Sequence, residues 1–312
     1  MADKFDDATT DFTSTIHREP YPAISPTKPS LSQAGKTVLI TGGGVGVGKY
    51  IAHNFVLASV ATIVIVGRRV NKLQETASEL EATGKQAGHT VKVIFKGCDV
   101  TDDKEVERVW DDLAKEGVYV DVLVLNSAKD TASQTLFELG YEEVWAQFEA
   151  NVKGPLHFAE RFYKQSPKGA AKTKYLLNVS TAAIHMHGHP LIDTRPAYSV
   201  TKGAGTLTIQ TLANRIPPED MQILSYHPGS IYGRAWEDQG ISRDAFPFDD
   251  DNLPGAFAVW AASKEASFLH GRYVFASWDV EELARGEFTS CFDADRDYLR
   301  ITVKGLDWMK KI

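Results

Sequence analysis

Short apolar runs rich in β-branched residues alternate with longer segments of mixed polarity along most of the chain. Runs with hardly any polar residue are typical of strands that a parallel sheet buries on both faces. We predict strands at Thr37–Ile40, Thr62–Val66, Val91–Phe95, Val122–Leu125, Tyr175–Val179, Gln222–Tyr226 and Arg272–Trp278.

The segments between these runs have the spacing of amphipathic helices. Ile51, Phe55 and Ala58 fall on one helical face. A second helix is predicted after Thr101, which we expect to be its N-cap, with Asp102 in its first turn. Alternating strands and helices predict an α/β fold, namely a Rossmann-type doubly wound parallel sheet in a single three-layer αβα domain.

The first 35 residues differ in composition from the rest of the chain. They are rich in Ser and Thr and are punctuated by Pro20, Pro22, Pro26 and Pro29. Proline neither continues a helix nor pairs in a central strand. We therefore expect residues 1–35 to form an extended or disordered arm, and residues 36–312 to form the domain.

Composition and charge exclude several classes of protein. Hydrophobic residues make up 43% of the chain and charged residues 24%, a balance that excludes wholesale disorder. The net charge of -7 argues against binding nucleic acid or an anionic membrane, because phosphate affinity needs clustered cations. Cys98 and Cys291 are too few for a disulfide framework or a zinc site. Without a secretion signal or a membrane span, we expect a cytoplasmic protein.

A glycine-rich segment, TGGGVGVG, occupies residues 41–48 between the first predicted strand and the first predicted helix. Glycines let a backbone approach a pyrophosphate closely, and the free amides and dipole of a helix N-terminus favour its charge. A tight turn without a ligand is the alternative. The position after a strand and before an amphipathic helix favours a dinucleotide site.

The end of the second predicted strand indicates which dinucleotide is bound. An NAD site usually carries Asp or Glu about 20 residues beyond the glycine motif. This chain has Arg68 and Arg69 there, and no carboxylate in residues 66–69. Two guanidinium groups suit a 2′-phosphate, which they can bind bidentately. We predict NADP(H) rather than NAD(H), with a solvated arginine pair as the alternative.

Tyr198 and Lys202 are one turn apart in a segment that we predict to be helical as far as Ile216. The phenol and the ammonium group therefore share one helical face. A phenol with a pKa of about 10 is a poor acid-base catalyst near neutral pH. A neighbouring ammonium group stabilises the phenolate and lowers that pKa, so the pair indicates proton transfer to or from a substrate.

With these motifs the sequence resembles the short-chain dehydrogenase/reductase family from about Lys36 to Trp278. The matching stretches are TGGGVGVG, CDV at 98–100, NSA at 126–128, NVKG at 151–154, NVST at 178–181, YSVTK at 198–202 and HPG at 227–229. The segment from Leu253 to Leu283 and the proline-rich arm resemble a fungal branch whose members often act on secondary metabolites.

The resemblance implies a role for each matching residue. Tyr198 would exchange a proton with the substrate oxygen, while Lys202 would hold the nicotinamide ribose and lower the pKa of Tyr198. Thr181 would polarise the same oxygen, with Ser180 as the other candidate, and Asn151 would bind a water linked to Lys202. The residues implied to contact the cofactor are Thr41, Gly42, Gly44, Val45, Gly46, Val47, Gly48, Arg68, Arg69, Asp99, Val100, Asn126, Ala128, Tyr198, Lys202, Pro228, Gly229 and Ile231.

Two positions depart from the family pattern. Lys129 follows Ala128 where a glycine is usual, and Gly233 replaces a threonine that would contact the nicotinamide carboxamide. The segment between Thr181 and Tyr198 is also longer than usual. These departures leave open how the cofactor is oriented.

A histidine-rich loop is one candidate for substrate binding. His185, His187 and His189 lie between Thr181 and Tyr198, and we expect their loop to line the substrate entrance. A metal site and a plain surface loop are the alternatives.

An aromatic segment that follows the sixth predicted strand is the other candidate. Residues 232–257 include Tyr232, Trp236 and Phe257 and are predicted to form a lid over an apolar substrate. A packed helix pair, with the aspartates at 249–251 as a solvated cap, is the alternative.

The favoured hypothesis is an NADPH-dependent oxidoreductase, a ketoreductase or alcohol dehydrogenase that acts on an apolar ketone or imine of secondary metabolism. The alternative is a protein of this fold that binds NADP(H) but catalyses a non-redox cyclisation or isomerisation. No metal is predicted. Relatives commonly pair through long helices, so a homodimer or tetramer is expected by analogy alone.

Overall fold

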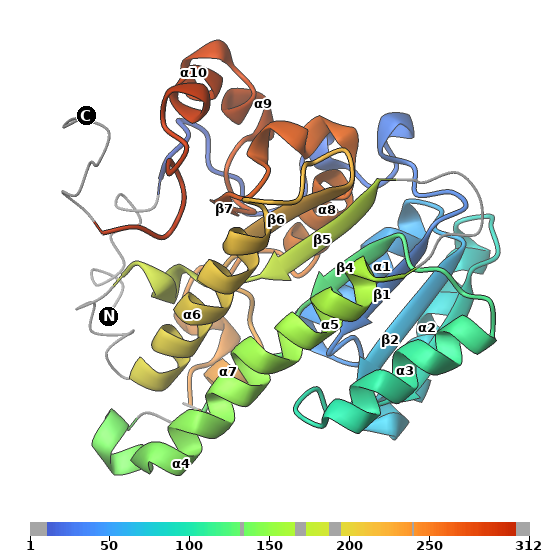
Figure 1. Cartoon of the computed structure of the whole chain (residues 1–312). Helices are drawn as coiled ribbons and strands as arrows, with labels where there is room; N and C mark the ends of the chain where they lie inside the picture. Colours follow the sequence, from blue (N-terminus) through green and yellow to red (C-terminus); the bar gives the residue numbers. More distant parts are fainter. Residues whose placement is uncertain (1–10, 132–133, 166–172, 187–194, 239, 304–312) are drawn as a thin grey trace.

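The computed structural model describes residues 11–131, 134–165, 173–186, 195–238 and 240–303. Within these residues seven parallel strands form one sheet, in the order β3-β2-β1-β4-β5-β6-β7 (Figure 1). The strands are β1 (Thr37–Thr41), β2 (Thr62–Gly67), β3 (Lys92–Gly97), β4 (Val122–Leu125), β5 (Lys174–Val179), β6 (Met221–His227) and β7 (Tyr273–Phe275). The predicted doubly wound sheet is confirmed, and its order reverses between β1 and β4, where such folds form a crevice.

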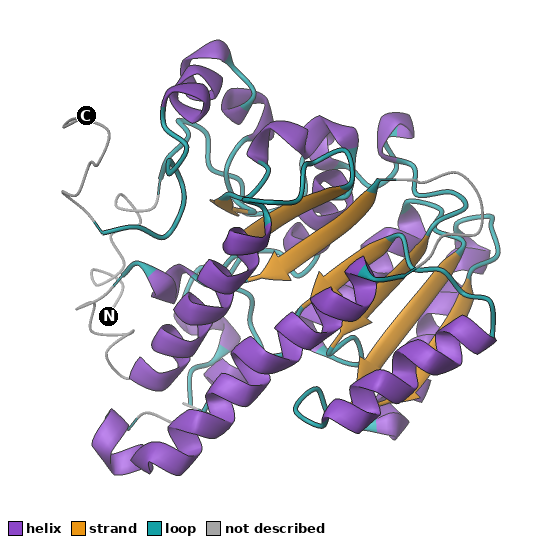
Figure 2. Cartoon of the chain, in the orientation of Figure 1, coloured by secondary structure: helices purple, strands orange, loops and turns teal. Residues whose placement is uncertain are grey.

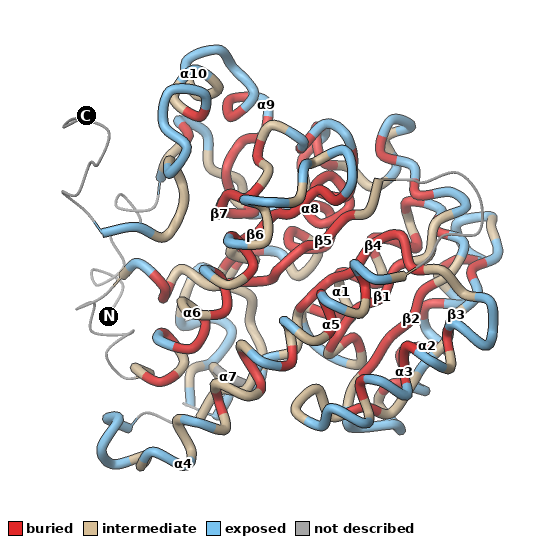
Figure 3. The backbone as a smooth tube through the Cα atoms, viewed as in Figure 1, coloured by how far each residue is buried: buried red, intermediate tan, exposed pale blue. Residues whose placement is uncertain are grey.

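Helices cover both faces of the sheet (Figure 2). One face packs against α1 (Gly46–Leu57), α2 (Val70–Gln86) and α8 (Leu253–Ala261), and the other against α3 (Asp103–Lys115), α5 (Gly154–Tyr163) and α6 (Pro196–Leu212). Alternate residues of β1 enter the two cores, Val38 and Ile40 on the first face and Leu39 on the second. Because both faces are packed, the central strands are buried along almost their whole length (Figure 3), which explains their unbroken apolar runs.

The prediction of burial on both faces is wrong for β3. This strand lies at the edge of the sheet and, among the described residues, pairs only with β2. Its residues are exposed or half-buried, and Phe95 is 37% exposed. β7 is also shorter than predicted, because its pairing with β6 covers only Tyr273–Phe275.

The predicted start of α3 is wrong by one residue. Asp102, not Thr101, is the N-cap, and its carboxylate accepts hydrogen bonds from the amides of Lys104 and Glu105. The Thr101 hydroxyl instead donates to the carboxylate of Asp99 at 2.8 Å, and the amides of the first turn of the helix are bound by Asp102. The predicted helix from Tyr198 to Ile216 also begins and ends earlier, at Pro196 and Leu212.

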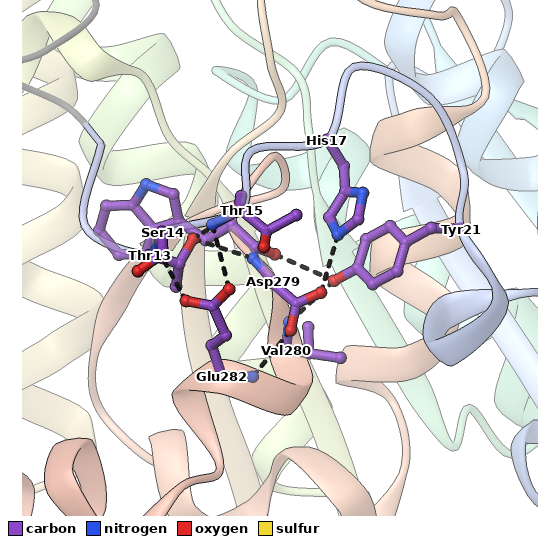
Figure 4. Close-up of polar contacts among 9 residues, drawn as sticks. Thr13, Ser14, Thr15, His17, Tyr21, Asp279, Val280 and Glu282 are labelled. Carbon is purple, nitrogen blue, oxygen red and sulfur yellow. Dashed lines mark hydrogen bonds and ion pairs between the residues drawn. The ribbon is translucent and has the colours of Figure 1, made fainter.

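Residues 11–35 pack along the domain, beginning beside the C-terminal elements α9 (Val280–Leu283) and α10 (Gly286–Ala294) and reaching the end of α8 at Gln33 (Figure 1). Ile24 and Leu31 each lie in a short 3₁₀ turn and are completely buried. The Tyr21 hydroxyl donates to the carbonyl of Trp278 and accepts from the amide of Val280 (Figure 4). This segment is therefore joined to the domain through both apolar and polar contacts.

Two further helices flank the carboxyl edge of the sheet. α4 (Leu136–Phe148) continues through a π-helical turn (Glu149–Lys153) into α5, and α7 (Arg234–Glu237) follows β6. In the described part of the chain, no helix is both long and apolar enough to cross a lipid bilayer.

Candidate active site

A groove of about 740 Å³ lies at the carboxyl ends of four neighbouring strands. Gly42 follows β1, Arg68 follows β2, Asp99 follows β3 and Asn126 follows β4, and all four line the groove. Carboxyl ends of parallel strands meet at one edge of a sheet, which is where ligands bind in this class of fold. The groove therefore brings together most of the residues that the sequence predicts to bind the adenosine half of a dinucleotide.

The turn between β1 and α1 requires glycine at its close approaches. Gly42 has a φ of +68°, which favours glycine. A Cβ on Gly48 would lie 2.4 Å from the Gly42 carbonyl oxygen, and one on Gly43 would lie 2.5 Å from a methyl of Ile65. α1 begins at Gly46 with no side-chain cap, so the amides of its first turn can bind an anion. These features fit a pyrophosphate.

Thr41 and Asn126 hold this turn in place. The Thr41 hydroxyl accepts hydrogen bonds from the amides of Asn126 at 2.9 Å and Ser127 at 3.0 Å. The Asn126 side chain donates in return to the Thr41 carbonyl at 3.0 Å. Thr41 is buried behind the turn, whereas Asn126 also lines the groove. Both predicted cofactor residues thus have a structural role as well.

Arg68 and Arg69 are exposed and line the groove together with Lys72. Burial favours a raised pKa for the nearby Asp99 carboxyl, but hydrogen bonds from Thr101 and the charges of Arg68 and Lys129 hold it below its usual value. Asp99 is therefore ionised at neutral pH. The positive charge of Arg68 thus partly offsets that of Asp99 at the groove, and Arg69 and Lys72 add further positive charge along its lining.

Tyr198 and Thr181 meet where β5 ends and α6 begins, and their side chains are joined by a hydrogen bond. The Ser199 hydroxyl donates to the carbonyl of Ala183 at 2.7 Å, which fixes the first turn of α6 to the segment after β5. The Thr181 hydroxyl also accepts from the Ala183 amide at 3.3 Å. The two hydroxyl groups therefore have a defined relative position.

Lys202 lies one turn further along α6 and is almost completely buried. Its Nζ donates to the carbonyl of Val179 at 2.6 Å, and burial lowers its pKa to about 8. Burial and the charge of Asp130 raise the pKa of Tyr198 to about 12, although the bond to Thr181 and the charge of Arg195 oppose this. The expected lowering of the Tyr198 pKa by Lys202 is thus not found here, because burial dominates at both groups.

Ser180 and Thr181 have different partners. The Ser180 hydroxyl is buried and lies 2.6 Å from that of Thr206 on α6. Thr181 instead contacts Tyr198. Of the two hydroxyl groups that the sequence offered, the one beside the phenol is therefore that of Thr181.

Asn151 lies in the π-helical turn and holds the chain after β4. Its Oδ1 accepts from the Lys129 amide at 2.8 Å, and its Nδ2 donates to the Lys129 carbonyl and to the Thr201 hydroxyl, each at 2.9 Å. The Lys129 ammonium group is directed to Glu143 on α4, at 2.9 Å. The cation that replaces a glycine in the family pattern is therefore neutralised at the groove wall.

Sequence reasoning missed the ion pair between Asp130 and Arg195. The pair joins the loop after β4 to the start of α6, and both charges act on Tyr198. Burial raises the pKa of Asp130, while the charge of Arg195 lowers it. An isolated aspartate and arginine in two loops give no signal in a sequence, so only the fold could bring them to notice.

The histidine-rich loop is described only in part, since His187 and His189 lie outside the described residues. His185 packs against Phe275 and Tyr273. It also lies near the half-buried His227, whose pKa is lowered to about 3 by desolvation and by the charge of His185. Among the residues that the structure describes, no cluster of three metal-ligating side chains occurs.

The aromatic segment after β6 folds on itself. Tyr232 and Trp236 pack edge-to-face against Phe248, and Phe246 packs against the same ring. Arg234, at the start of α7, lines the dinucleotide groove. Phe257 does not belong to this cluster, because it lies on α8 in the core against Tyr226. The predicted lid boundary of 257 therefore extends too far into the domain.

The loop that follows β6 contains Pro228, Gly229 and Ile231, which the resemblance implies to contact the cofactor. Gly229 has a φ of +99°, and a Cβ there would lie 2.8 Å from a carboxylate oxygen of Asp249. Asp249 is 7% exposed, so it is not the solvated cap that the alternative for this segment supposed.

Comparisons with known proteins agree with this geometry. A family model described as short chain dehydrogenase matches residues 36–241. The chain is 36% identical over 273 residues to a short chain dehydrogenase/reductase of Claviceps purpurea, with 87% of each chain covered. It is 34% identical over 275 residues to the short chain dehydrogenase/reductase nsrO of Aspergillus novofumigatus, which covers 87% of this chain and 90% of that protein. Both relatives come from fungi.

Solved structures of lower identity share the fold. L-sorbose reductase from Gluconobacter frateurii, complexed with NADPH and L-sorbose, has a TM-score of 0.67 at 22% identity, covering 79% of this chain and 96% of that one. A dehydrogenase/reductase from Sinorhizobium meliloti has a TM-score of 0.66 at 21% identity, covering 82% of this chain and 98% of that one. Identities this low support the architecture and not a shared substrate.

Proposed function

Because the chain belongs to the short-chain dehydrogenase/reductase family, an oxidoreductase family that binds nicotinamide cofactors, we propose that it reduces a carbonyl or imine group with NADPH. The observation that carries the proposal is the contact between Thr181 and Tyr198, with Lys202 buried one helical turn away. These groups lie at the same edge of the sheet as the glycine turn, which fits a pyrophosphate.

Tyr198 is the proposed proton donor. Its raised pKa keeps the phenol protonated at neutral pH, which is the form that a reduction consumes. Thr181 donates a hydrogen bond to the substrate oxygen and so stabilises the negative charge that develops there. When bound, NADPH supplies the hydride to the neighbouring carbon. The buried Lys202, whose pKa is lowered to about 8, is the proposed source of the proton that restores the phenol after proton transfer.

The preference for NADP(H) rests on the end of β2. Arg68 and Arg69 line the groove there. The charge of Arg68 acts on the ionised carboxylate of Asp99, whose pKa it lowers. Guanidinium groups bind a phosphate bidentately, whereas the ribose hydroxyls of NAD need a carboxylate acceptor at this strand end. NADPH is therefore expected to bind more tightly than NADH.

The substrate class is proposed from the side chains around the phenol. His185, Tyr273 and Phe275 pack together near Tyr198, and the aromatic segment with Tyr232 and Trp236 follows β6. Such surroundings favour a mostly apolar ketone or imine. Since the relatives are fungal, an intermediate of secondary metabolism is the class that we would screen first.

A panel of apolar ketones and imines, assayed with NADPH and with NADH, tests this function. We expect loss of NADPH absorbance in step with substrate consumption, and slower turnover with NADH. Product formed without cofactor oxidation would contradict the redox function and point to cyclisation or isomerisation, which family membership does not favour. Absence of turnover with bound NADPH would contradict catalysis on this substrate class.

We further propose a homodimer or tetramer. Phe137, which precedes a kink at Gly140 in α4, is fully exposed, and Tyr141 and Trp145 after the kink are 81% and 64% exposed. Large apolar side chains exposed to this degree are typical of a protein interface. Size-exclusion chromatography with light scattering would measure the assembly. The cytoplasmic location stays a prediction from the sequence.

A further inference from the structure

Asp249 is a buried carboxylate that the proposed chemistry does not use. It lies in the segment between α7 and α8, and its side chain is 8% exposed. Oδ2 accepts a hydrogen bond from the Ser230 amide at 2.7 Å, and the Asp249 amide donates to the Ser230 carbonyl at 3.0 Å. Asp249 and Ser230 are thus joined by two hydrogen bonds in opposite directions.

The carboxylate also packs directly on the backbone of the loop after β6. Gly229 leaves just enough room, because a Cβ there would approach Asp249 Oδ2 to 2.8 Å. The φ of +99° at Gly229 is a conformation that other residues rarely adopt. The loop is therefore shaped around the carboxylate.

Arg18 of the N-terminal segment lies on the other side of Asp249. Its Nη1 is 3.4 Å from Asp249 Oδ1 and donates to the Pro247 carbonyl at 2.8 Å. The Arg18 carbonyl accepts from the amide of Asp250 at 2.7 Å. Two residues that are 231 positions apart are thereby joined through the segment that follows α7.

From these contacts we propose that Asp249 is a positioning residue for residues 228–231, and that Arg18 holds Asp249 in that role. The inference rests on the proposed function, and it assigns this loop to the nicotinamide half of NADPH, because β6 lies beside β5, which Thr181 follows, and not beside β1 or β2 at the groove. The carboxylate fixes the conformation of the loop through its hydrogen bond from the Ser230 amide and its packing on Gly229. The N-terminal segment then contributes to the active site without touching substrate or cofactor.

The test compares two ligands of the full-length protein. NADPH occupies both halves of the proposed site, whereas adenosine 2′,5′-bisphosphate has only the adenosine half, which is proposed to bind beside Arg68. For Asp249→Ala we expect NADPH affinity to fall about tenfold, since a hydrogen bond to a charged group is lost, with unchanged affinity for the bisphosphate. Asp249→Asn keeps the size of the side chain, so its NADPH affinity should lie between that of wild type and that of Asp249→Ala. Arg18→Ala should lower NADPH affinity about threefold.

Asp250→Asn is the matched control. This neighbouring carboxyl group is exposed and accepts a hydrogen bond from the Asn252 amide, away from the loop. The control should bind both ligands as wild type does. Equal weakening of both ligands by Asp249→Ala and Asp249→Asn would overturn the proposal, because it would indicate general damage to the fold. Unchanged NADPH affinity would overturn it as well.

Amide hydrogen exchange of residues 229–232 without any ligand separates this inference from the proposed function. Faster exchange in Asp249→Ala and Arg18→Ala, but not in Asp250→Asn, is the expected result. Exchange at the wild-type rate would overturn the anchoring role whatever the ligands do. If wild type bound neither ligand, the proposed function would be wrong, and so would the effect of Asp249 on NADPH binding. Hydrogen exchange alone would then decide whether Asp249 anchors the loop.

Discussion

Lys202 Nζ donates a hydrogen bond to the carbonyl oxygen of Val179 at 2.6 Å, which joins α6 to the last residue of β5. The contact places a buried ammonium group beside the strand end that carries Thr181. Burial lowers the pKa of this group to about 8, so it titrates close to the pH at which enzymes are assayed.

The lowered Lys202 pKa predicts a pH dependence of stability. In the unfolded chain the lysine has a pKa of about 10.4. Between about pH 8 and about pH 10.4 the unfolded chain therefore binds more protons than the folded chain, and stability rises with pH. Relative to Lys202→Met, which carries no titrating group, wild type should gain up to about 3 kcal/mol between pH 7 and pH 10. Urea unfolding at several pH values measures this difference, and parallel curves for the two proteins would contradict it.

Replacing Tyr198 by Phe should remove turnover and leave NADPH binding nearly intact. The variant loses the proposed proton donor but keeps the ring, so we expect kcat to fall by at least about 100-fold. The matched control is Tyr175→Phe, which removes the hydroxyl of a buried tyrosine at the start of β5. A Tyr198→Phe variant with the wild-type rate would show that the proton comes from another group.

Thr181 and Ser180 are adjacent, and their different partners predict different results. Thr181→Val should lower kcat by about 100-fold, because the hydroxyl beside Tyr198 is lost while the shape is kept. Ser180→Ala should leave kcat nearly unchanged but cost about 1–3 kcal/mol of stability, since it deprives the buried Thr206 hydroxyl of its partner. Steady-state kinetics and thermal unfolding of both variants check this, and the reverse pattern would assign the role to Ser180.

The double substitution of Arg68 and Arg69 by Ala should abolish the preference for NADPH. Each charge-assisted hydrogen bond to a phosphate contributes about 1.5–3 kcal/mol, so NADPH affinity should fall by at least about tenfold while NADH affinity changes little. Lys85→Ala removes an exposed cation at the end of α2 and is the control. An equal loss of affinity for both cofactors would mean that the arginines do not bind the 2′-phosphate specifically.

The sequence could predict those parts of the fold and site that depend on local patterns. The glycine turn and the pair Arg68–Arg69 each lie within a few residues of a buried strand, and the structure places both at one groove. The exposure of Phe95 could not be predicted, because it depends on which strand forms the edge of the sheet. Asp130 escaped notice and Asp249 was considered only as part of a solvated cap, because their partners, Arg195 and Arg18, are distant in sequence and only the fold brings them together.

The contact between the N-terminal segment and α9 predicts a loss of stability in acid. His17 Nε2 lies 2.8 Å from Asp279 Oδ2, and the His17 ring stacks on Tyr21 (Figure 4). Burial favours a raised pKa for Asp279, but hydrogen bonds from His17 and from the amide of Glu282 hold it below its usual value. A carboxyl group with a lowered pKa in the folded state stabilises the protein above its unfolded pKa of about 3.9, and this stabilisation is lost as the pH falls below that value.

Asp279→Asn isolates this charge, because asparagine remains a good N-cap for α9. At pH 7 we expect the variant to be about 1 kcal/mol less stable than wild type, since a hydrogen bond to a charged group becomes a neutral one. The difference should shrink as the pH falls below about 4, where wild type also becomes neutral at this position. Urea unfolding at pH 7, 5 and 3.5 measures it, with the exposed Asp238→Asn as the control. A difference that stayed constant across this range would mean that Asp279 stabilises the contact through shape alone and not through its charge.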